Sequence, residues 1–323
     1  MSAGGGTKAI VAALSANLGI AVTKFLAFLL TGSSSMLAES IHSVADSGNQ
    51  FLLLVGGRRA QREATPQHPF GYGRERYVYA FIVAIVLFSL GGLFALYEGW
   101  HKVQHPEAIE SWQWVPVLVL LIAICLEGYS FRTAIKESNQ TRGSRSWVEY
   151  VRTAKAPELP VVLLEDFGAL IGLALALVGV GLTLITGNGV FDGAGTLAIG
   201  ALLVVIAVVL AVETKSLLLG EGASPSAVRQ IEQALTADPR VERVIHMKTM
   251  HLGPEELLVA AKIAVRHDET AADVARAIDD AEERVRAAVP IARMIYLEPD
   301  VWSAEAAARG SDLPPVPGSA AGH

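Results

Sequence analysis

The chain has 323 residues, of which 52% are hydrophobic and 18% are charged. This composition is too apolar for an ordinary soluble domain and indicates a protein that crosses a membrane several times. A formal net charge of −6 argues against a nucleic-acid partner, and the single cysteine, Cys125, excludes a disulfide framework and a CxxC metal site.

Six apolar stretches follow one another from the N-terminus, and each approaches or exceeds the roughly 20 residues that a spanning helix needs. The four-residue link 32–35 and the three-residue link 187–189 predict tight turns, so the flanking helices should form hairpins. We therefore predict an all-α six-helix transmembrane bundle over residues 1–219, with spans at about 10–31, 36–57, 78–100, 112–133, 159–186 and 190–218.

Basic residues predict how these spans are oriented. The loops after the second and fourth spans are rich in Arg and Lys, whereas the links on the other side hold only Lys102. The positive-inside rule then places both termini in the cytoplasm. The start MSAGGGTK lacks a typical cleavable signal, so we expect the first span to be retained. An Ala/Gly-rich chain with no recognisable organelle-targeting segment favours a bacterial inner membrane.

Residues 220–302 are polar and mixed, and they predict a small cytoplasmic α+β domain of order α-β-β-α-β. Ser224 and Thr270 are candidate caps for its two helices. The expected elements are a helix at 224–237, strands at 241–252 and 257–265, a helix at 270–288 and a strand at 292–297. The tail 303–323 lacks the apolar content to fold, so we expect it to be disordered.

The second span carries a polar stripe. Glu39, His42, Asp46 and Asn49 fall on one side of a helix with 3.6 residues per turn. An imidazole and a carboxylate four residues apart, His42 and Asp46, can share one divalent metal ion. The alternative is a hydrogen bond that holds membrane helices together, worth about 0.6 kcal/mol. Burying an ionisable group at bilayer depth costs roughly 2.5–3.5 kcal/mol, so we favour the metal.

The start of the fifth span, LLEDFG, adds two carboxylates, Glu165 and Asp166. Adjacent residues of a helix point about 100° apart, so only one of the two can face the site, and the sequence leaves open which. With His42 and Asp46, either one gives a nitrogen–oxygen ligand set. Such a set suits Zn²⁺, and also Co²⁺, Fe²⁺ or Mn²⁺, better than Mg²⁺.

Three further polar positions have two interpretations each. His68, in the loop 66–76, either meets metal at the cytoplasmic mouth or belongs to a turn whose arginines contact acidic groups of the cytoplasmic domain, which we favour. Glu127 is a candidate for a secondary polar contact in the fourth span. Asp192 either assists metal exit or caps the sixth helix.

The stretch MLAESIHSVADSGNQ, followed by HPFGYGRERYVYAF, resembles the cation diffusion facilitator family over about residues 8–300. These are six-span divalent-metal exporters with a cytoplasmic α/β domain. The resemblance implies that His42, Asp46 and Asp166 are metal ligands. Val162 stands where the family usually has a fourth ligand, so either Glu165 or water completes the set. The stretches LLEDFGALIG and MIYLEPDVW look closest to the zinc transporter 9-like branch.

The resemblance also implies a homodimer formed through the cytoplasmic domain. Family members often hold regulatory zinc there, and His246 and Glu298 fall at suitable positions. Lys262 and Tyr296 replace histidines of some relatives, so a preserved zinc cluster is not expected. His251 and His267 are expected on the surface.

The resulting hypothesis is Zn²⁺/H⁺ antiport by alternating access. The alternatives are an exporter of Mn²⁺, Fe²⁺ or Co²⁺ from the same family, and a non-transporting membrane metal sensor or scaffold. The sequence has no HExxH, GxSxG or Walker motif, so we expect neither an enzyme nor a nucleotide-driven transporter. The expected partners are a divalent metal ion and the lipid bilayer.

Overall fold

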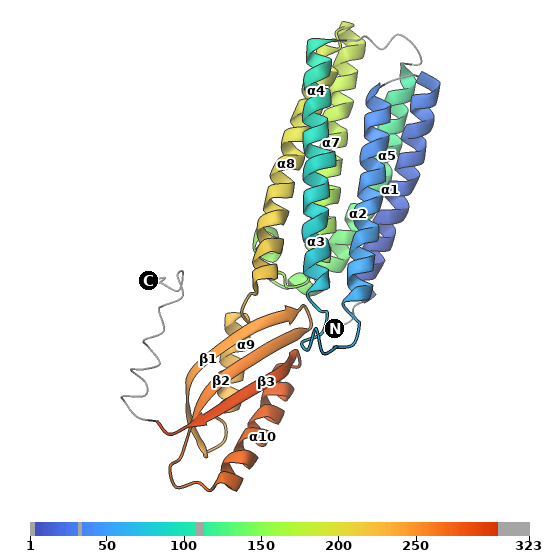
Figure 1. Cartoon of the computed structure of the whole chain (residues 1–323). Helices are drawn as coiled ribbons and strands as arrows, with labels where there is room; N and C mark the ends of the chain where they lie inside the picture. The colour runs from blue at the N-terminus through green and yellow to red at the C-terminus, as the bar shows by residue number, and fades with distance from the viewer. Residues whose placement is uncertain (1–3, 32–33, 107–112, 303–323) are drawn as a thin grey trace, which may run out of the picture. The chain divides into compact units, whose positions relative to one another are not determined.

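Long apolar runs become long helices in the computed structural model, which describes residues 4–31, 34–106 and 113–302 (Figure 1). Side chains at several positions of the first two helices lie outside this description, His42 and Glu39 among them. The predicted disordered tail, 303–323, also lies outside it. The chain divides into two compact units, Met1–Leu218 and Leu219–His323, each treated below by itself.

The first unit is a helical bundle. Four helical segments within the described residues are long and apolar enough to cross a membrane, and α1 and α2 run alongside them (Figure 1). The predicted six-helix bundle is thereby confirmed. Its helices are α1 (Gly4–Thr31), α2 (Ser34–Arg59), α3 (Glu75–Val86), α4 (Phe94–Gln104), α5 (Trp114–Arg142), α7 (Glu158–Thr186) and α8 (Val190–Leu219).

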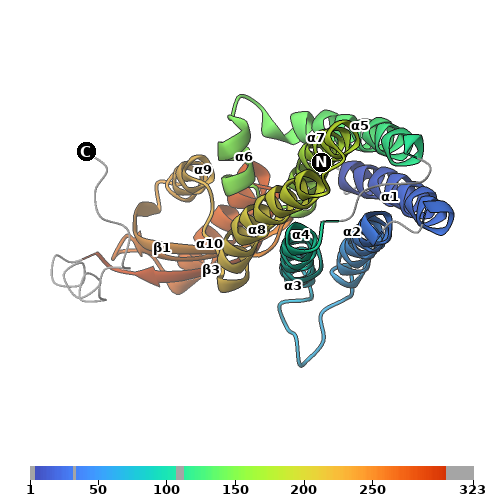
Figure 2. The ribbon, with the colours of Figure 1, turned by 90° about the horizontal axis from the view of Figure 1, so that it is seen from above.

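The order of packing brings α2, α5 and α7 around one interior. α1 packs on both α2 and α5, and α5 packs on α7. Seen along the bundle, α1 lies between α2 and α5 (Figure 2). Side chains that point inward from α2, α5 and α7 can therefore meet, although α2 and α7 are about a hundred residues or more apart in the sequence.

Two features of this unit escaped sequence reasoning. The third span is not one α-helix: a π-helical segment, η1 (Leu87–Leu93), separates α3 from α4. A short helix, α6 (Trp147–Thr153), interrupts the loop before α7, and the Ser146 hydroxyl caps it by accepting a hydrogen bond from the Glu149 amide.

Glycines let α4 and α8 approach closely. A Cβ atom on Gly99 would lie 2.6 Å from the backbone nitrogen of Leu197, and one on Gly200 would lie 2.7 Å from that of Leu96. Both distances are shorter than real Cβ contacts allow. Small residues play this part in membrane helix pairs generally, because backbones can then pack against each other.

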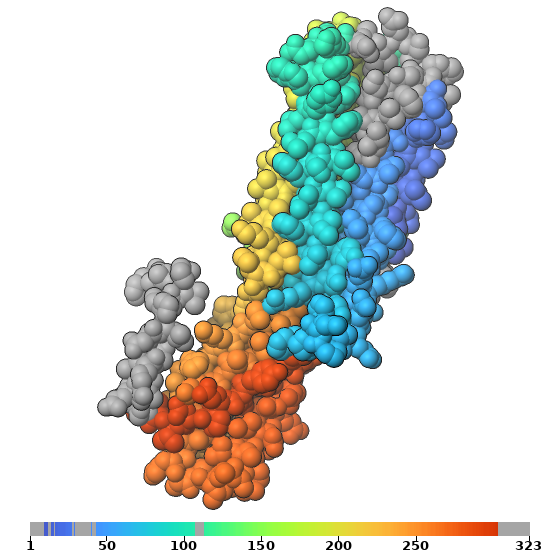
Figure 3. All heavy atoms as spheres, viewed as in Figure 1, coloured from blue at the N-terminus to red at the C-terminus, as the bar shows by residue number. Residues whose placement is uncertain are grey.

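The loop between α2 and α3, which is light blue in Figure 3, is held by contacts among its own side chains. His68 stacks on Tyr72 with ring centroids 4.6 Å apart, and Arg62 lies over the same tyrosine ring. Arg76 pairs with Glu158, at the start of α7 in the same unit. The planar guanidinium of Arg76 thus matches a carboxylate of its own bundle. The predicted contact of these arginines with the cytoplasmic domain stays a prediction.

The second unit has the predicted order α-β-β-α-β. Its elements are α9 (Pro225–Leu235), β1 (Val241–Gly253), β2 (Glu256–Val265), α10 (Ala271–Ala288) and β3 (Ala292–Asp300). Ser224 and Thr270 cap the helices as predicted, since their hydroxyls accept hydrogen bonds from the amides of Ala227 and Asp273. The strand order is β1-β2-β3, antiparallel between the first pair and parallel between the second.

Alternation along the strands divides the sheet into two faces. Leu257, Val259 and Ile263 of β2 point to one face, where they form a core with side chains of α9 and α10. His251 lies on this face too and is only 3% exposed, with Nδ1 3.3 Å from the carbonyl oxygen of Gly253. The prediction that His251 is a surface residue was therefore wrong, because its register in β1 turns it inward. His267 is exposed, as predicted.

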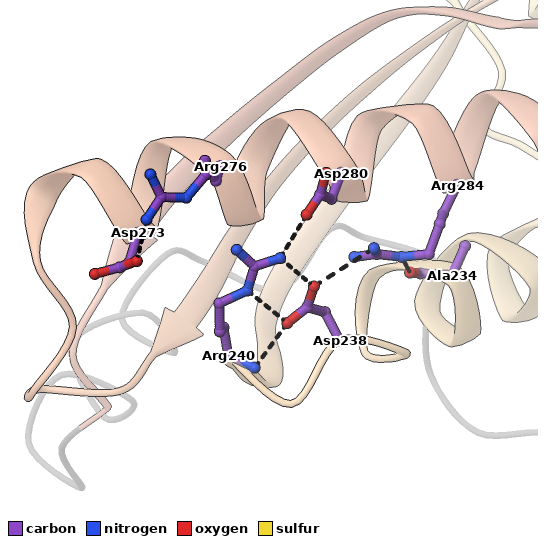
Figure 4. Close-up of polar contacts among 7 residues, drawn as sticks. All are labelled: Ala234, Asp238, Arg240, Asp273, Arg276, Asp280 and Arg284. Atoms are coloured by element: carbon purple, nitrogen blue, oxygen red, sulfur yellow. Dashed lines mark hydrogen bonds and ion pairs between the residues drawn. The ribbon is translucent and has the colours of Figure 1, made fainter.

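A charged cluster joins the turn before β1 to α10 (Figure 4). The Arg240 guanidinium donates to both carboxylate oxygens of Asp238, at 2.9 and 2.6 Å, and also to Asp280. Arg284 lies 3.5 Å from Asp238 on the other side. The hydrogen bonds from Arg240 and its charge hold the pKa of the Asp238 carboxyl well below its usual range.

Candidate metal site

The second span provides the first carboxylate of the site. Asp46 lies on α2, facing the bundle interior, and is 3% exposed. His42 lies one turn earlier on the same helix, but its side chain is outside the described set. Of the predicted imidazole–carboxylate pair, the structure therefore places only the carboxylate side chain of Asp46.

The fifth span provides two buried carboxylates that take different directions. Glu165 accepts a hydrogen bond of 2.8 Å from the Asn49 amide on one carboxylate oxygen and one of 2.5 Å from the Gln50 amide on the other. Asp166 accepts a hydrogen bond of 2.7 Å from the hydroxyl of Ser130 in α5. The 100° between neighbouring helical residues therefore turns Glu165 to α2 and Asp166 to α5.

A small cavity of about 20 Å³ opens beside Asp46, and its lining does not include Glu165 or Asp166. This is enough for one water-sized particle. Its lining combines charged and polar side chains from α1, α2 and α5 with small and apolar residues from α7 and α8: Lys24, Ser43, Asp46, Glu127, Gly168, Ala169, Gly172, Leu173, Ile199 and Leu203.

Two of the charged lining residues were not predicted as members of the site. Glu127 was expected as a secondary contact; it is 4% exposed and lines the same cavity as Asp46. Lys24 is 3% exposed, and its ammonium donates a hydrogen bond of 3.1 Å to the Ser43 hydroxyl. The signal for Lys24 was in the sequence, since it is a lone lysine near the middle of an apolar span.

Carboxylates are gathered here at considerable cost. Asp46, Glu127, Glu165 and Asp166 are each 4% exposed or less, and all lie in membrane helices. Each such group costs roughly 2.5–3.5 kcal/mol to insert. Among the side chains that the structure describes, no three His, Cys, Asp or Glu residues are grouped closely enough to hold a metal ion. Both carboxylate oxygens of Glu165 are occupied by hydrogen bonds from amides of α2.

Asp192, predicted to act at the exit or to cap its helix, forms an ion pair with a lysine, and both predicted roles stay predictions. Its carboxylate lies 3.0 Å from the Lys102 ammonium of α4. The contact joins the beginning of α8 to the end of the third span.

A bundle of membrane helices with ionisable side chains buried around a small cavity is typical of proteins that conduct or carry ions. Residues 10–219 match the family model of the cation efflux transmembrane domain. The chain therefore belongs to the cation diffusion facilitator family and is an integral membrane protein, as the resemblance indicated.

Several curated proteins share more than this domain with the chain. It is 34% identical over 243 residues to the mouse "Proton-coupled zinc antiporter SLC30A9, mitochondrial", which covers 74% of this chain and 42% of that protein. The human protein of the same name is 33% identical over 242 residues, with the same coverage. "Metal tolerance protein C4" of Arabidopsis thaliana is 27% identical over 258 residues, 79% of this chain and 56% of that protein.

These matches confirm the zinc transporter 9-like branch that the sequence indicated. The chain spans about two fifths of the length of the first two relatives. All three relatives carry the name of a transporter or of metal tolerance, and none carries that of an enzyme.

Proposed function

We propose that the chain exports a divalent metal cation by alternating access in exchange for protons, with Zn²⁺ as its principal cargo. The names of the relatives support proton-coupled zinc transport. The observation that carries the proposal for this chain is the burial of Asp46 and Asp166, 3% and 1% exposed, on two membrane helices around one interior. Ionisable side chains at such depth are expensive to insert, and in membrane proteins they typically mark the path of an ion or a substrate.

In this proposal His42, Asp46 and Asp166 bind the metal, and Glu165 serves as a clamp between α7 and α2. Both carboxylate oxygens of Glu165 already accept hydrogen bonds from amides of α2. Asp166 accepts the hydrogen bond from Ser130 on one carboxylate oxygen, and a carboxylate has further acceptor capacity for a cation. Water then completes the ligand set, in place of the side chain that Val162 lacks.

Proton exchange follows from the chemistry of these ligands. Metal binding requires a neutral imidazole and ionised carboxylates, so arrival of the metal releases protons from the site. When the site faces the other side, protons return and the metal is displaced. His42 suits this step, because an ordinary imidazole pKa lies near 6.5, within the working range of pH.

Two alternative functions are compatible with the same site. A site with several carboxylate oxygens also accommodates Mn²⁺, Fe²⁺ or Co²⁺. A membrane metal sensor or scaffold would bind metal without moving it. The first differs from the main proposal in the preferred metal, and the second in the absence of flux.

We also propose that the protein is a homodimer joined through the second unit. The face of the sheet opposite α9 and α10 holds a row of apolar side chains, Met250, Leu258 and Met294, which are neighbours in the strand register. Exposed Tyr296 lies beside them. A second copy of this face is a suitable cover for such a patch.

The proposed setting is a bacterial inner membrane with both termini in the cytoplasm. The distribution of Arg and Lys between the loops supports this orientation. The mouse and human relatives are named as mitochondrial, so the membrane needs its own test. Fractionation of the source cells tests the membrane. A cysteine introduced in the 66–76 loop of a Cys125→Ser variant, labelled in intact cells and in inverted vesicles, tests whether this loop faces the cytoplasm.

The transport test uses purified protein in liposomes that enclose a metal indicator. Zn²⁺, Mn²⁺, Fe²⁺ and Co²⁺ are compared with and without a pH gradient, and Asp46→Ala is the control. We expect flux of Zn²⁺ that depends on the gradient and falls to background in Asp46→Ala. Folded protein that carries none of the four metals would favour the sensor or scaffold, and full flux in Asp46→Ala would refute the site.

A further inference from the structure

Lys24 is a buried cation within the membrane bundle. It lies in α1, a helix otherwise dominated by apolar and small residues, and is 3% exposed. A lysine in a spanning helix commonly extends its side chain to the membrane surface. The burial of Lys24 and the 3.1 Å hydrogen bond from its Nζ to Ser43 keep its ammonium inside the bundle instead.

The ammonium is held beside Asp46, one of the proposed metal ligands. Ser43, its hydrogen-bond acceptor, directly follows His42 and lies one turn before Asp46 on α2. Lys24, Asp46 and Glu127 line the same cavity of about 20 Å³. A cation that enters this space meets two carboxylates and one ammonium. The lining contributed by α7 and α8 is uncharged.

Electrostatics then gives Lys24 two effects. When the cavity is empty, its positive charge offsets one of the carboxylates and lowers the cost of burying them. When a divalent ion is present, the same charge repels it. At separations of a few ångströms within a protein this repulsion is much larger than in water.

We propose that Lys24 is an affinity-setting residue of the transport site: a resident cation that balances the empty cavity and weakens the binding of divalent metal enough for its release. The inference rests on the proposed transport function. It assigns to α1 a part in that function, in addition to the helices that carry the ligands.

The test measures Zn²⁺ binding to the full-length protein in nanodiscs by isothermal titration calorimetry. Lys24→Met removes the charge and keeps most of the side-chain volume, and Lys24→Arg keeps the charge. We expect the Kd for Zn²⁺ to fall about tenfold or more in Lys24→Met and to stay within about twofold in Lys24→Arg. In liposomes, Lys24→Met should show a lower KM and a lower maximal flux, because bound metal leaves more slowly.

A double variant separates charge from packing. Lys24→Met combined with Glu127→Gln removes one positive and one negative charge from the cavity, so its Kd should return toward the wild-type value. Lys102→Met is the matched control, since that lysine pairs with Asp192 and does not line the cavity. If the Kd for Zn²⁺ in Lys24→Met is unchanged or higher than in wild type, the inference is overturned.

Two further results keep the outcomes distinct. If Lys24→Met does not fold, Lys24→Gln takes its place in the titration, because it keeps a hydrogen-bond donor for Ser43. If Lys24→Met, Lys24→Gln and Lys24→Arg all fail to fold, the inference is overturned in favour of a packing role. If wild type and Asp46→Ala bind Zn²⁺ equally, the proposed metal site fails, whatever Lys24 does. If binding needs Asp46 but is insensitive to Lys24, only the inference about Lys24 fails.

Discussion

Asn49 of α2 donates a hydrogen bond of 2.8 Å to Glu165 of α7, across 116 positions of sequence. Gln50 donates a second bond to the other oxygen of the same carboxylate. All three side chains are 4% exposed or less. This contact connects the two helices that carry the proposed ligands, so it bears both on the shape of the site and on the movement of α2 against α7.

The two adjacent carboxylates of α7 should respond differently to neutralisation. We expect Asp166→Asn to weaken Zn²⁺ binding by about 100-fold or more, since even partners of a ligand are worth 10–100-fold. Glu165→Gln should leave the Kd within about fivefold but lower the apparent unfolding temperature, because charged hydrogen bonds contribute about 1.5–3 kcal/mol each. Calorimetry and thermal unfolding in detergent measure the two effects. The reverse pattern would make Glu165 the ligand.

Ser130 should matter through Asp166. Its hydroxyl donates a hydrogen bond of 2.7 Å to that carboxylate and is buried with it. Ser130→Ala removes the donor that orients Asp166, and we expect Zn²⁺ affinity to fall about 10-fold. Ser130→Thr, which keeps the hydroxyl, should retain most of the affinity. Equal affinities in wild type and Ser130→Ala would show that Asp166 needs no orienting partner or is not a ligand.

The close packing of α4 and α8 predicts a contrast between two glycines. In Gly99→Ala the new methyl group would lie 2.6 Å from the backbone nitrogen of Leu197 and 3.0 Å from the carbonyl oxygen of Gly193. Backbone atoms cannot turn aside, so the helices must separate and the apparent unfolding temperature should fall. Gly128→Ala, with nothing within 4 Å of the new Cβ, is the matched control and should be neutral or slightly stabilising. Equal unfolding temperatures would contradict the helix contact.

The pH dependence of the second unit should depend on Asp238. Contacts with Arg240 lower the pKa of this carboxyl in the folded state below its unfolded value of about 3.9. A lowered folded pKa means that the stabilisation is fully present above the unfolded pKa and is lost as pH falls through the folded pKa. Asp238→Asn should therefore destabilise the unit at pH 7. The difference in free energy of unfolding between wild type and Asp238→Asn should narrow below about pH 4.

Amide hydrogen exchange in α9 and β1, followed through a urea series at pH 7 and pH 3, measures this gap. Asp268→Asn is a suitable control, because that carboxylate is exposed and forms an ion pair with Arg266, its near neighbour in the sequence. A gap that is as wide at pH 3 as at pH 7 would exclude the ionised carboxylate as its source.

The fold was well predicted from the sequence because it depends on patterns that extend over many residues. Apolar runs of 20 residues, basic loops and alternating strands report burial directly, and the caps at Ser224 and Thr270 are local chemistry. Side-chain direction depends on tertiary packing instead. No pattern within LLEDFG indicates that Glu165 turns to the amides of α2, since those amides lie more than a hundred residues earlier.

The features that were not predicted share this cause. His251 is buried because of strand register, which a bulge between His251 and Gly253 alters locally. Lys24 belongs to the cavity because α1 packs between α2 and α5. Arg76 meets Glu158 because the loop folds back on its own bundle.

The π-helical segment Leu87–Leu93 determines which side of the following helix, α4, faces α8. A π turn takes up one residue more than an α turn, so the segment holds one residue more than an α-helix would along the same path. Everything after it is rotated by about 100° from the course of an uninterrupted helix. Deleting one residue within this segment should restore a continuous α-helix, and it would turn Gly99 away from α8 and present a bulkier neighbour in its place.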